Sequence, residues 1–368
     1  MIYVHVPFCK SFCIYCGFYS ESLSRCGGVK AVEQWAEAVC AEALSRKDEI
    51  LSSIGTDTLY IGGGTPSVLP LSVLGQVVNR IREICGKKGE ETFEEFTVEV
   101  NPDDIVKGGL PYLEGLRKLG INRISMGVQS FDDGILRWMG RRHSSSDAEK
   151  AVELIREAGF TNLSLDLISG IRGLSDEMWE DTLEKTLSLS PEHISAYQLS
   201  VEEGSVLDEM VSTGKYSEAD DAQCERQYRI LCRKLSDAGY VHYEVSNFSK
   251  PGKEAIHNSA YWGRAPYVGL GPGAHSLVGE RERRWNSETV PSYSSSNEIL
   301  SDEDLRVERV MLSLRTAKGI SEEELFRLCG QDKVRRMLNE GSIISSGSVI
   351  RIPEDHFFTS DSIIRELL

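Results

Sequence analysis

The 368-residue sequence contains no apolar run that approaches the length needed to cross a bilayer, so a membrane-spanning protein is not expected. Its opening residues, MIYVHVPFCK, lack the basic region and long apolar stretch of a secretion signal. They also lack the Arg- and Ser-rich amphipathic character of an organelle leader. These absences predict a cytoplasmic protein.

Positive charge is scarce in this sequence. It holds 41 Lys and Arg residues against 57 Asp and Glu residues, giving a formal net charge of -16. A surface this acidic repels phosphate backbones and anionic lipid heads, so a general nucleic-acid binder is not expected. Arg281, Arg283 and Arg284 form the one dense basic run near aromatic residues, and we interpret it as a solvated loop.

Cysteine is too sparse for a disulfide scaffold, which would be shorter and denser in cysteine. The nine cysteines are an odd number, and only Cys9, Cys13 and Cys16 lie close together in the sequence. This distribution indicates a reducing compartment and a single metal site.

The first half of the chain alternates short β-rich runs with longer stretches of helical periodicity. The expected strands are Ile2–Val6, Thr58–Ile61, Thr97–Val100, Arg123–Gly127, Leu163–Ile168 and Ile194–Gln198. The expected helices between them are Ala31–Leu51, Leu71–Cys85, Gly109–Leu119, Ser146–Ala158 and Ser175–Leu189. Six such units in order predict an α/β fold with a parallel sheet, closed or open, whose functional side chains lie at the carboxyl ends of the strands.

The pattern changes after about residue 200. A helix is expected over Ala219–Ala238, followed by a Gly-, Pro- and aromatic-rich segment, Tyr243–Asn286, and a polar linker, Ser292–Asn297. The rest alternates charged helices with a hairpin-like stretch around Ser342–Ile352. We therefore predict three parts: a barrel over 1–210, a connecting segment over 211–295 and a small helix-rich C-terminal domain over 296–368.

The cysteine triplet has the spacing C-x3-C-x2-C and directly follows the first expected strand. A [4Fe–4S] cluster normally takes four cysteines, so three would leave one iron open to a substrate or cofactor. A zinc site usually has four ligands, often in paired C-x2-C units, and no second pair is present. His5 could be a fourth ligand, but it lies within the expected strand. Three unrelated thiols remain the other alternative.

This spacing after the first strand of a βα array resembles the radical SAM superfamily. The resemblance implies a partial (β/α)6 barrel, a [4Fe–4S] cluster on Cys9, Cys13 and Cys16, and S-adenosylmethionine (SAM) held at the open iron through its amino and carboxylate groups. In that superfamily the chemistry belongs to the cofactor, and the protein positions it.

Further motifs match the SAM pocket of that superfamily. Gly63, Gly64 and Thr65 lie in GGGTP and resemble the motif that meets the amino group of SAM, although a glycine turn alone is a weak signal. Glu99 resembles the ribose contact, and an edge-strand carboxylate in water is its alternative. Gln129 can both donate and accept hydrogen bonds. Arg141 could hold the SAM carboxylate, or it could be a surface arginine.

Three more residues belong to this predicted pocket. Asp166 lies between leucines, where a carboxylate is unfavourable unless it is paired or ligand-bound. Tyr3 and Tyr15 resemble aromatic contacts near SAM, with ordinary packing as the alternative. One departure from the superfamily pattern is DLISGIRG, in which Arg172 stands where the family often has proline. It alters the loop but removes no ligand.

The motifs VHVPFC, GGGTP, EVNP, GVQSF and GLGPGAHS together resemble the oxygen-independent coproporphyrinogen oxidase group, which has an oxidase branch and a heme-chaperone (HemW-type) branch. The oxidase branch carries a fourth cysteine where this chain has Phe18, and it has an N-terminal extension that this chain lacks. Both features favour the chaperone branch.

The run HNSAYW matches the H-N-x-x-Y-W motif that the chaperone branch links to heme. The resemblance implies His257 as a heme ligand, and heme and heme-accepting, membrane-associated proteins as partners. A core histidine with packing aromatics is the alternative for His257. The alternative function is that of an enzyme, oxygen-independent coproporphyrinogen III dehydrogenase, and a radical SAM enzyme with another substrate also remains open.

Overall fold

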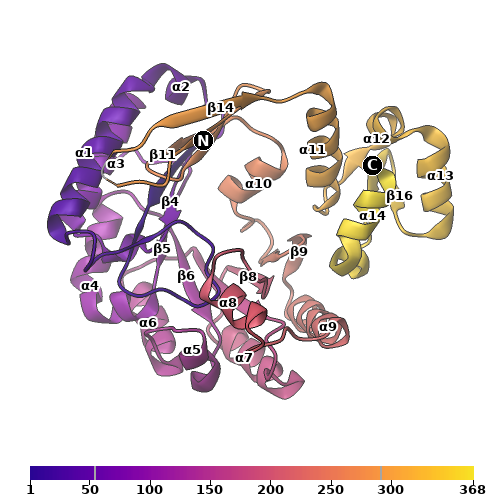
Figure 1. Cartoon of the computed structure of the whole chain (residues 1–368), viewed down its shortest axis with the longest axis horizontal. Helices are drawn as coiled ribbons and strands as arrows, with labels where there is room; N and C mark the ends of the chain where they lie inside the picture. Colours follow the sequence, from indigo (N-terminus) through magenta and orange to yellow (C-terminus); the bar gives the residue numbers. More distant parts are fainter. Residues whose placement is uncertain (54, 291) are drawn as a thin grey trace.

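The computed structural model describes residues 1–53, 55–290 and 292–368. Six parallel strands form the centre of a nine-stranded sheet, and all six expected strands are present. Their bounds are β1 Ile2–Val6, β4 Thr58–Gly63, β5 Glu95–Val100, β6 Arg123–Gln129, β7 Leu163–Ser169 and β8 His193–Gln198. They lie in chain order and curve into a partial barrel with helices on the outside (Figure 1). The α/β prediction is therefore confirmed.

The helices of the βα units lie outside the sheet and cover its apolar face (Figure 1). Their bounds are α1 Val29–Ser45, α2 Lys47–Ser52, α3 Leu71–Ile84, α4 Pro102–Lys118, α5 Asp133–Trp138, α6 Ser145–Glu157 and α7 Asp176–Ser188. The single helix expected over Ala31–Leu51 is divided at Arg46 into α1 and α2. Helix α4 begins seven residues before its expected start, with Pro102 in the first turn and a break at Gly109.

The connecting segment enlarges the sheet at both edges. Strand β11, Val268–Leu270, pairs parallel with β1, although more than 250 residues separate them in the chain. Strands β10, Asn247–Ser249, and β9, Val241–Glu244, extend the other edge in antiparallel pairing after β8. Helices α8, Val206–Ser212, and α9, Asp221–Asp237, lie between these parts of the chain.

Helix α10, Ile256–Trp262, covers the amino ends of β4 and β5. Thr58, the first residue of β4, and Glu95, the first residue of β5, both bond to it. In Figure 1 this short helix lies beside the sheet, between the barrel and the C-terminal part of the chain. It therefore lies at the end of the barrel opposite to the carboxyl ends of the strands.

A second, three-stranded sheet follows, with bounds β12 His275–Val278, β13 Glu282–Asn286 and β14 Ser295–Ile299. The linker expected over Ser292–Asn297 is therefore partly wrong, because residues 295–297 belong to β14. Backbone pairing with β13 gives this polar stretch its structure, and every residue of β14 is exposed.

The C-terminal part has a hydrophobic core of its own, formed by residues between Val310 and Leu367. Its helices are α11 Asp302–Leu314, α12 Glu322–Cys329, α13 Gln331–Glu340 and α14 Ser360–Leu367. Its small sheet has the order β15 Ile320–Ser321, β17 Val349–Arg351 and β16 Ile344–Ser346. Strands β16 and β17 form the expected hairpin.

Within the residues described, no helix combines the length and the apolar character needed to traverse a bilayer.

Candidate SAM and cluster site

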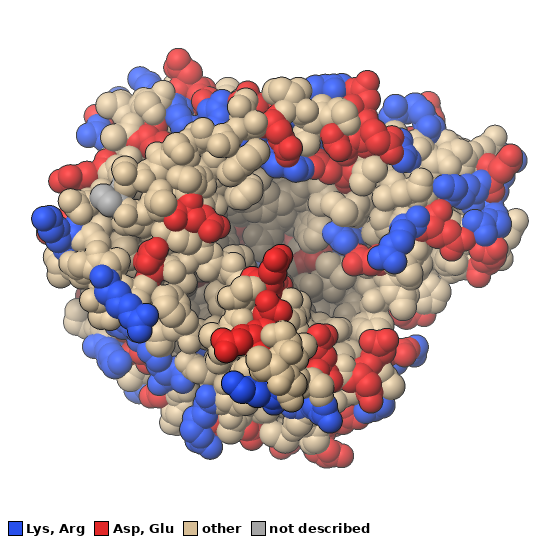
Figure 2. Space-filling model, viewed as in Figure 1, with Lys and Arg blue, Asp and Glu red and all other residues tan. Residues whose placement is uncertain are grey.

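A cavity of about 550 Å³ opens at the carboxyl ends of the barrel strands. It brings together the cysteine loop and most of the polar residues that the sequence singles out. From that set it is lined by Cys9, Cys13, Cys16, Tyr15, Gly63, Gly64, Thr65, Glu99, Gln129, Arg141 and Asp166. The face in Figure 2 is hollowed near its centre, and the visible walls of this hollow are mostly uncharged.

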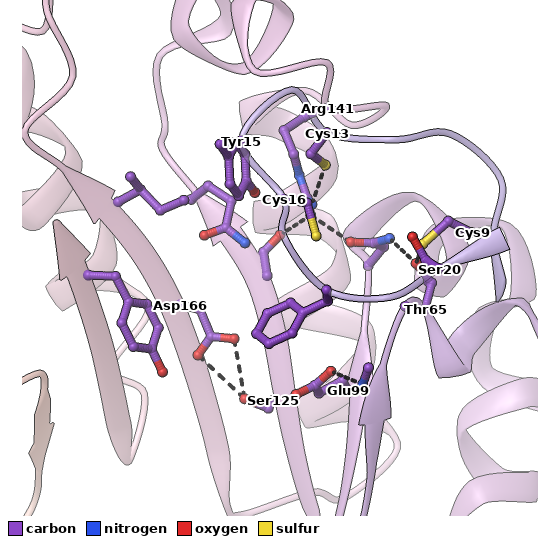
Figure 3. A pocket seen from close by; sticks show the side chains of 18 of the residues that line it. Cys9, Cys13, Tyr15, Cys16, Ser20, Thr65, Glu99, Ser125, Arg141 and Asp166 are labelled. Carbon is purple, nitrogen blue, oxygen red and sulfur yellow. Dashed lines mark hydrogen bonds between the residues drawn. The ribbon is translucent and has the colours of Figure 1, made fainter. Parts of the chain in front are cut away.

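The cysteine loop, residues 9–16, folds over one side of the cavity (Figure 3). Cys9 ends the short strand β2, Phe8–Cys9, which pairs with β3, Glu21–Ser22. The Cys9 Sγ lies 3.3 Å from the Thr65 Oγ1, and the thiol is buried. Burial raises the pKa of Cys9 and raises that of Cys16 to about 11. Both thiols are therefore protonated in the metal-free protein and would lose their protons on binding a metal centre.

The three sulfurs fit a cluster better than a single ion. Across the described part of the chain, no three His, Cys, Asp or Glu side chains converge closely enough to chelate one metal ion. In a [4Fe–4S] cluster each cysteine would bind a different iron, so the three sulfurs need not converge on one point. His5 offers no fourth ligand, because its ring nitrogens bond to the Tyr3 hydroxyl and the Tyr19 carbonyl.

The glycines after β4 allow the chain to pass close to its neighbours. Gly63 has a φ of 109°, and a Cβ there would lie 2.6 Å from the ring of His5. A Cβ on Gly64 would meet the backbone oxygens of Val6 and Phe8 at 2.9 Å. The positive φ at Gly63 and the fixed backbone beside Gly64 both disfavour a side chain here, and the turn lines the cavity.

Glu99 projects from β5 into the cavity, as Figure 3 shows. Its Oε1 accepts a hydrogen bond from the Tyr60 hydroxyl at 2.7 Å, and its Oε2 accepts one from the Gly63 amide at 3.0 Å. Burial raises the pKa of this carboxyl to about 7, with the nearby Asp166 also raising it, despite the two hydrogen bonds. The edge-strand alternative is therefore wrong for Glu99.

Asp166 and Gln129 complete the wall on the neighbouring strands. The Ser125 hydroxyl lies 3.4 Å from both carboxylate oxygens of Asp166, and burial raises the pKa of that carboxyl. Gln129 ends β6 with a φ of 68°, and the register against β7 shifts between Gly127 and Gln129. A side chain with positive φ at a bulge is strained, and such strain gathers at functional sites.

Arg141 is held firmly at the edge of the cavity and is not a surface arginine. Its Nη2 donates to the Asn101 Oδ1 at 2.5 Å and to the Gly127 carbonyl at 2.6 Å, and its Nη1 donates to the Cys13 Sγ at 3.3 Å. Its Nε is buried and has no partner within the described residues. These bonds use three of the five guanidinium donors, and Arg141 lines the cavity.

The two predicted tyrosine contacts differ in their positions. Tyr15 lines the cavity beside Arg141 (Figure 3). Tyr3 is not among the residues that line it. Its hydroxyl lies 3.0 Å from the His5 Nδ1, and the centre of its ring lies 6.1 Å from that of Tyr60. In this structure Tyr3 therefore packs against a residue that lines the cavity.

His257 lies on α10, away from the cavity lining, and its side chain is enclosed. The residue is 1% exposed. Its Nδ1 lies 2.8 Å from the Thr58 Oγ1 and its Nε2 lies 3.1 Å from the Tyr261 hydroxyl. Burial lowers the pKa of the imidazole to about 3, so the ring is neutral. Neutral imidazole is the form that binds iron, but in this conformation neither nitrogen is free for heme.

Several cavity residues have no signal in a single sequence. They include Tyr60, Arg123, Ser125, Ser195, Tyr197 and Asn258. Tyr60 and Ser125 occupy alternate positions on strands that were expected, so the period-2 pattern places them on the same face as Glu99. Asn258 of α10 reaches the cavity from the amino side of the barrel, which follows only from the tertiary fold.

The comparisons with known proteins agree with this geometry. The model of the radical SAM superfamily matches residues 3–186. The chain also has the fold of coproporphyrinogen III oxidase (HemN) from Escherichia coli, with a TM-score of 0.80 over 100% of this chain and 89% of that one, at 20% identity. The chain therefore belongs to the radical SAM superfamily.

Relatives that match along most of the chain narrow this assignment. A protein of Bacillus subtilis named heme chaperone HemW is 32% identical over 89% of this chain and 86% of its own length. A protein of Lactococcus lactis with the same name is 30% identical over 100% of this chain and 96% of its own length. Within the superfamily, the chain belongs to the family of these heme chaperones.

Proposed function

We propose that this protein is a heme chaperone that binds heme and passes it to acceptor proteins, and that it carries a SAM-coordinating [4Fe–4S] cluster. The match with the two HemW relatives over 86% and 96% of their lengths carries this proposal. Because the match runs past residue 186, it includes the connecting segment with α10 and the C-terminal part as well as the barrel.

The cavity residues suit the proposed cofactors. Cys9, Cys13 and Cys16 would hold the cluster, which supplies an open iron for the amino and carboxylate groups of SAM. The Arg141 guanidinium lines the cavity and would attract the SAM carboxylate, and the Glu99 carboxylate can accept hydrogen bonds from ribose hydroxyls. Gln129 and Asp166 provide further polar contacts around the same ligand.

We also propose that His257 binds the heme iron after α10 opens. Opening is needed because heme must displace the Thr58 or the Tyr261 hydroxyl from the imidazole. Helix α10 has only seven residues, so its opening breaks few bonds to the parallel strands, namely those to Thr58 and Glu95. The aromatic rings of Tyr261 and Trp262 would then offer flat apolar contact to the porphyrin.

Heme titration of three variants tests this ligand. His257→Ala should weaken heme binding about tenfold or more, because the axial ligand is lost. Tyr261→Phe should speed heme binding, because it keeps the ring but removes the hydroxyl from Nε2. Tyr267→Phe is the matched control, since its ring packs 4.7 Å from that of Tyr261 and it has no bond to His257. Unchanged heme affinity in His257→Ala would show that His257 is not the heme ligand.

The second candidate function is oxidative decarboxylation of coproporphyrinogen, which the well-formed SAM cavity favours. Against it, Phe18 occupies the position of the fourth cysteine of the oxidase branch, and this residue is 71% exposed. Anaerobic incubation of reconstituted protein with SAM, a reductant and coproporphyrinogen III separates the two functions. We expect no protoporphyrinogen, while a genuine oxidase in the same assay forms it.

A further inference from the structure

A buried cluster of charges lies beside the cysteine loop and takes no part in the contacts proposed for SAM. Asp103 and Asp104 occupy the first turn of α4, with side chains 7% and 2% exposed. A buried carboxylate is strongly unfavourable unless cations and hydrogen-bond donors surround it. The neighbours of these two residues therefore show what the pair does.

Both oxygens of Asp104 are fully engaged. The Lys10 Nζ lies 2.5 Å from its Oδ1, and the Arg142 Nη2 lies 3.0 Å from its Oδ2. The Ser67 hydroxyl donates to the same Oδ2 at 3.0 Å. Arg142 also reaches the Asp103 Oδ2 through Nη1 at 2.7 Å. The carboxylate thus joins three segments of chain that are far apart in sequence.

Each of these three segments carries a residue that is next to a proposed cluster ligand or in contact with one. Lys10 follows Cys9 directly, and Arg142 follows Arg141, which donates to the Cys13 Sγ at 3.3 Å. The third segment, with Ser67, begins at Thr65, whose hydroxyl lies 3.3 Å from the Cys9 Sγ.

Asn101, at the start of α4, strengthens the same connections. Its side-chain amide donates to the Thr65 Oγ1 at 3.3 Å, and its Oδ1 accepts from Arg141 at 2.5 Å. The first turn of α4 is therefore tied to Cys9 and to Cys13 through one intermediate side chain each.

The rest of the cysteine loop is held by few contacts. The Ile14 amide donates to the Met139 carbonyl at 3.1 Å, and the Ile14 carbonyl accepts from the Leu207 amide at 2.8 Å. Lys10 and Ser11 are exposed. Because three thiolates repel one another, a loop that is ordered in advance lowers the free energy needed to gather them around a cluster.

We propose that Asp104 is a positioning residue for the cluster, which fixes the cysteine loop through Lys10 and the Arg141–Arg142 segment. This inference rests on the proposed cluster and adds the device that keeps its ligands in place. It assigns Asp104 no contact with SAM or with heme.

Two lysines on neighbouring acids provide a matched test. Lys10 pairs with Asp104, whereas Lys107 pairs with Asp103 at 3.2 Å and is 69% exposed. We expect Lys10→Ala to lose its cluster to a chelator about tenfold faster than the unchanged protein, because a partly buried ion pair is broken. Lys107→Ala should lose its cluster at the unchanged rate, and Lys10→Arg should restore the slow loss.

The measurements are iron and sulfide content after anaerobic reconstitution, the rate of absorbance loss with chelator, and the EPR spectrum of the reduced cluster with and without SAM. Asp104→Asn should show faster loss than Lys10→Ala and an altered EPR spectrum, because it removes the ion pair with Lys10 and one of the two ion pairs of Arg142. Circular dichroism of each apo-protein checks that the fold is intact, so that a general loss of structure is recognised.

Equal rates of cluster loss in Lys10→Ala, Lys107→Ala and the unchanged protein would overturn the positioning role while leaving the proposed cluster standing. Failure of the unchanged protein to hold iron and sulfide would instead overturn both. Faster loss in Lys10→Ala that Lys10→Arg does not repair would also count against an ion-pair mechanism.

Discussion

Glu99 shows how one side chain couples ligand binding to protonation. It lies in the cavity beside a second carboxyl, Asp166, and both pKa values are raised, chiefly by burial. The ionised form of Glu99 is a stronger acceptor for ribose hydroxyls than the protonated form, which turns one acceptor site into a donor. Its pKa of about 7 therefore lies within the range where small changes in pH alter the population of that form.

We predict that the affinity for SAM falls as the pH is lowered through about 7, because Glu99 takes up a proton there. Isothermal titration of SAM into reconstituted protein at several pH values measures this. Glu99→Gln should bind SAM more weakly at high pH and show a flatter profile. A variant that keeps the full pH dependence would exclude Glu99 as its source.

The same carboxyl predicts a trend in stability. Its folded-state pKa of about 7 exceeds its ordinary value of 4.5, so folding favours the uncharged form. This contribution, roughly 3 kcal/mol, is complete below the ordinary pKa and is lost as the pH rises through about 7. Urea unfolding of the apo-protein should therefore show a smaller decline in the free energy of unfolding over this range for Glu99→Gln.

At the residue scale, local sequence patterns singled out 11 of the 35 residues that line the cavity. Glycine runs, spaced cysteines and acids between apolar residues are visible in a sequence because each is unusual in its setting. The engagement of His257 by Thr58 could not be foreseen, since 199 positions separate the two residues. For Tyr3, no local pattern shows whether a strand residue faces a ligand or the layer behind it.

At the scale of elements, α10 depends on a single acid from the barrel. The buried Glu95 accepts hydrogen bonds from the backbone amides of Ile256 at 2.8 Å and His257 at 2.9 Å. These amides belong to the first turn of a helix, where they have no partner within the helix itself. Glu95 thus acts as an N-terminal cap supplied by another element, and it fixes the helix that carries His257.

We predict that Glu95→Gln weakens the attachment of α10. The substitution replaces one of the two accepting carboxylate oxygens with an NH2 group, which cannot accept a hydrogen bond from a backbone amide. Hydrogen exchange of the Ile256 and His257 amides should be about tenfold faster, which corresponds to the loss of one capping interaction. The neighbouring Glu94 is exposed, so Glu94→Gln is the control and should leave this exchange unchanged. Equal exchange in both variants would show that packing, rather than Glu95, holds the helix.

Sequence periodicity placed the six barrel strands within two residues of most of their ends. It failed for β9, β10 and β11, which have three or four residues each and depend on pairing with distant strands. It also failed to divide Ala31–Leu51 at Arg46. There the break is set by tertiary contacts, because the Arg46 guanidinium donates to the Gly269 carbonyl at 2.8 Å.

At the scale of the whole molecule, two hydrophobic cores stabilise different parts of the chain. The larger core joins the barrel strands to their helices, and the smaller one holds the C-terminal part. They are linked through Tyr228, which packs against both. The cysteine loop and the strands that line the cavity belong to the larger unit.

We predict that Leu325→Ala, in the smaller core, destabilises the C-terminal part by about 2–5 kcal/mol, because a buried leucine leaves a cavity. Denaturant unfolding followed by protease sensitivity of residues 300–368 measures this. The affinity for SAM should remain unchanged. A loss of SAM affinity equal to the loss of stability would show that the two cores unfold as one.

The pairing of β1 with β11 has a consequence for folding during translation. Val4 pairs with Leu270, so roughly 260 residues must be translated before the second of these strands exists. At translation rates of about 5–20 residues per second, the edge of β1 that pairs with β11 stays unpaired for roughly 13 to 50 seconds. An unpaired strand edge is a template for aggregation. The nascent chain therefore passes through an interval in which its first strand depends on chaperones or on rapid burial by α1.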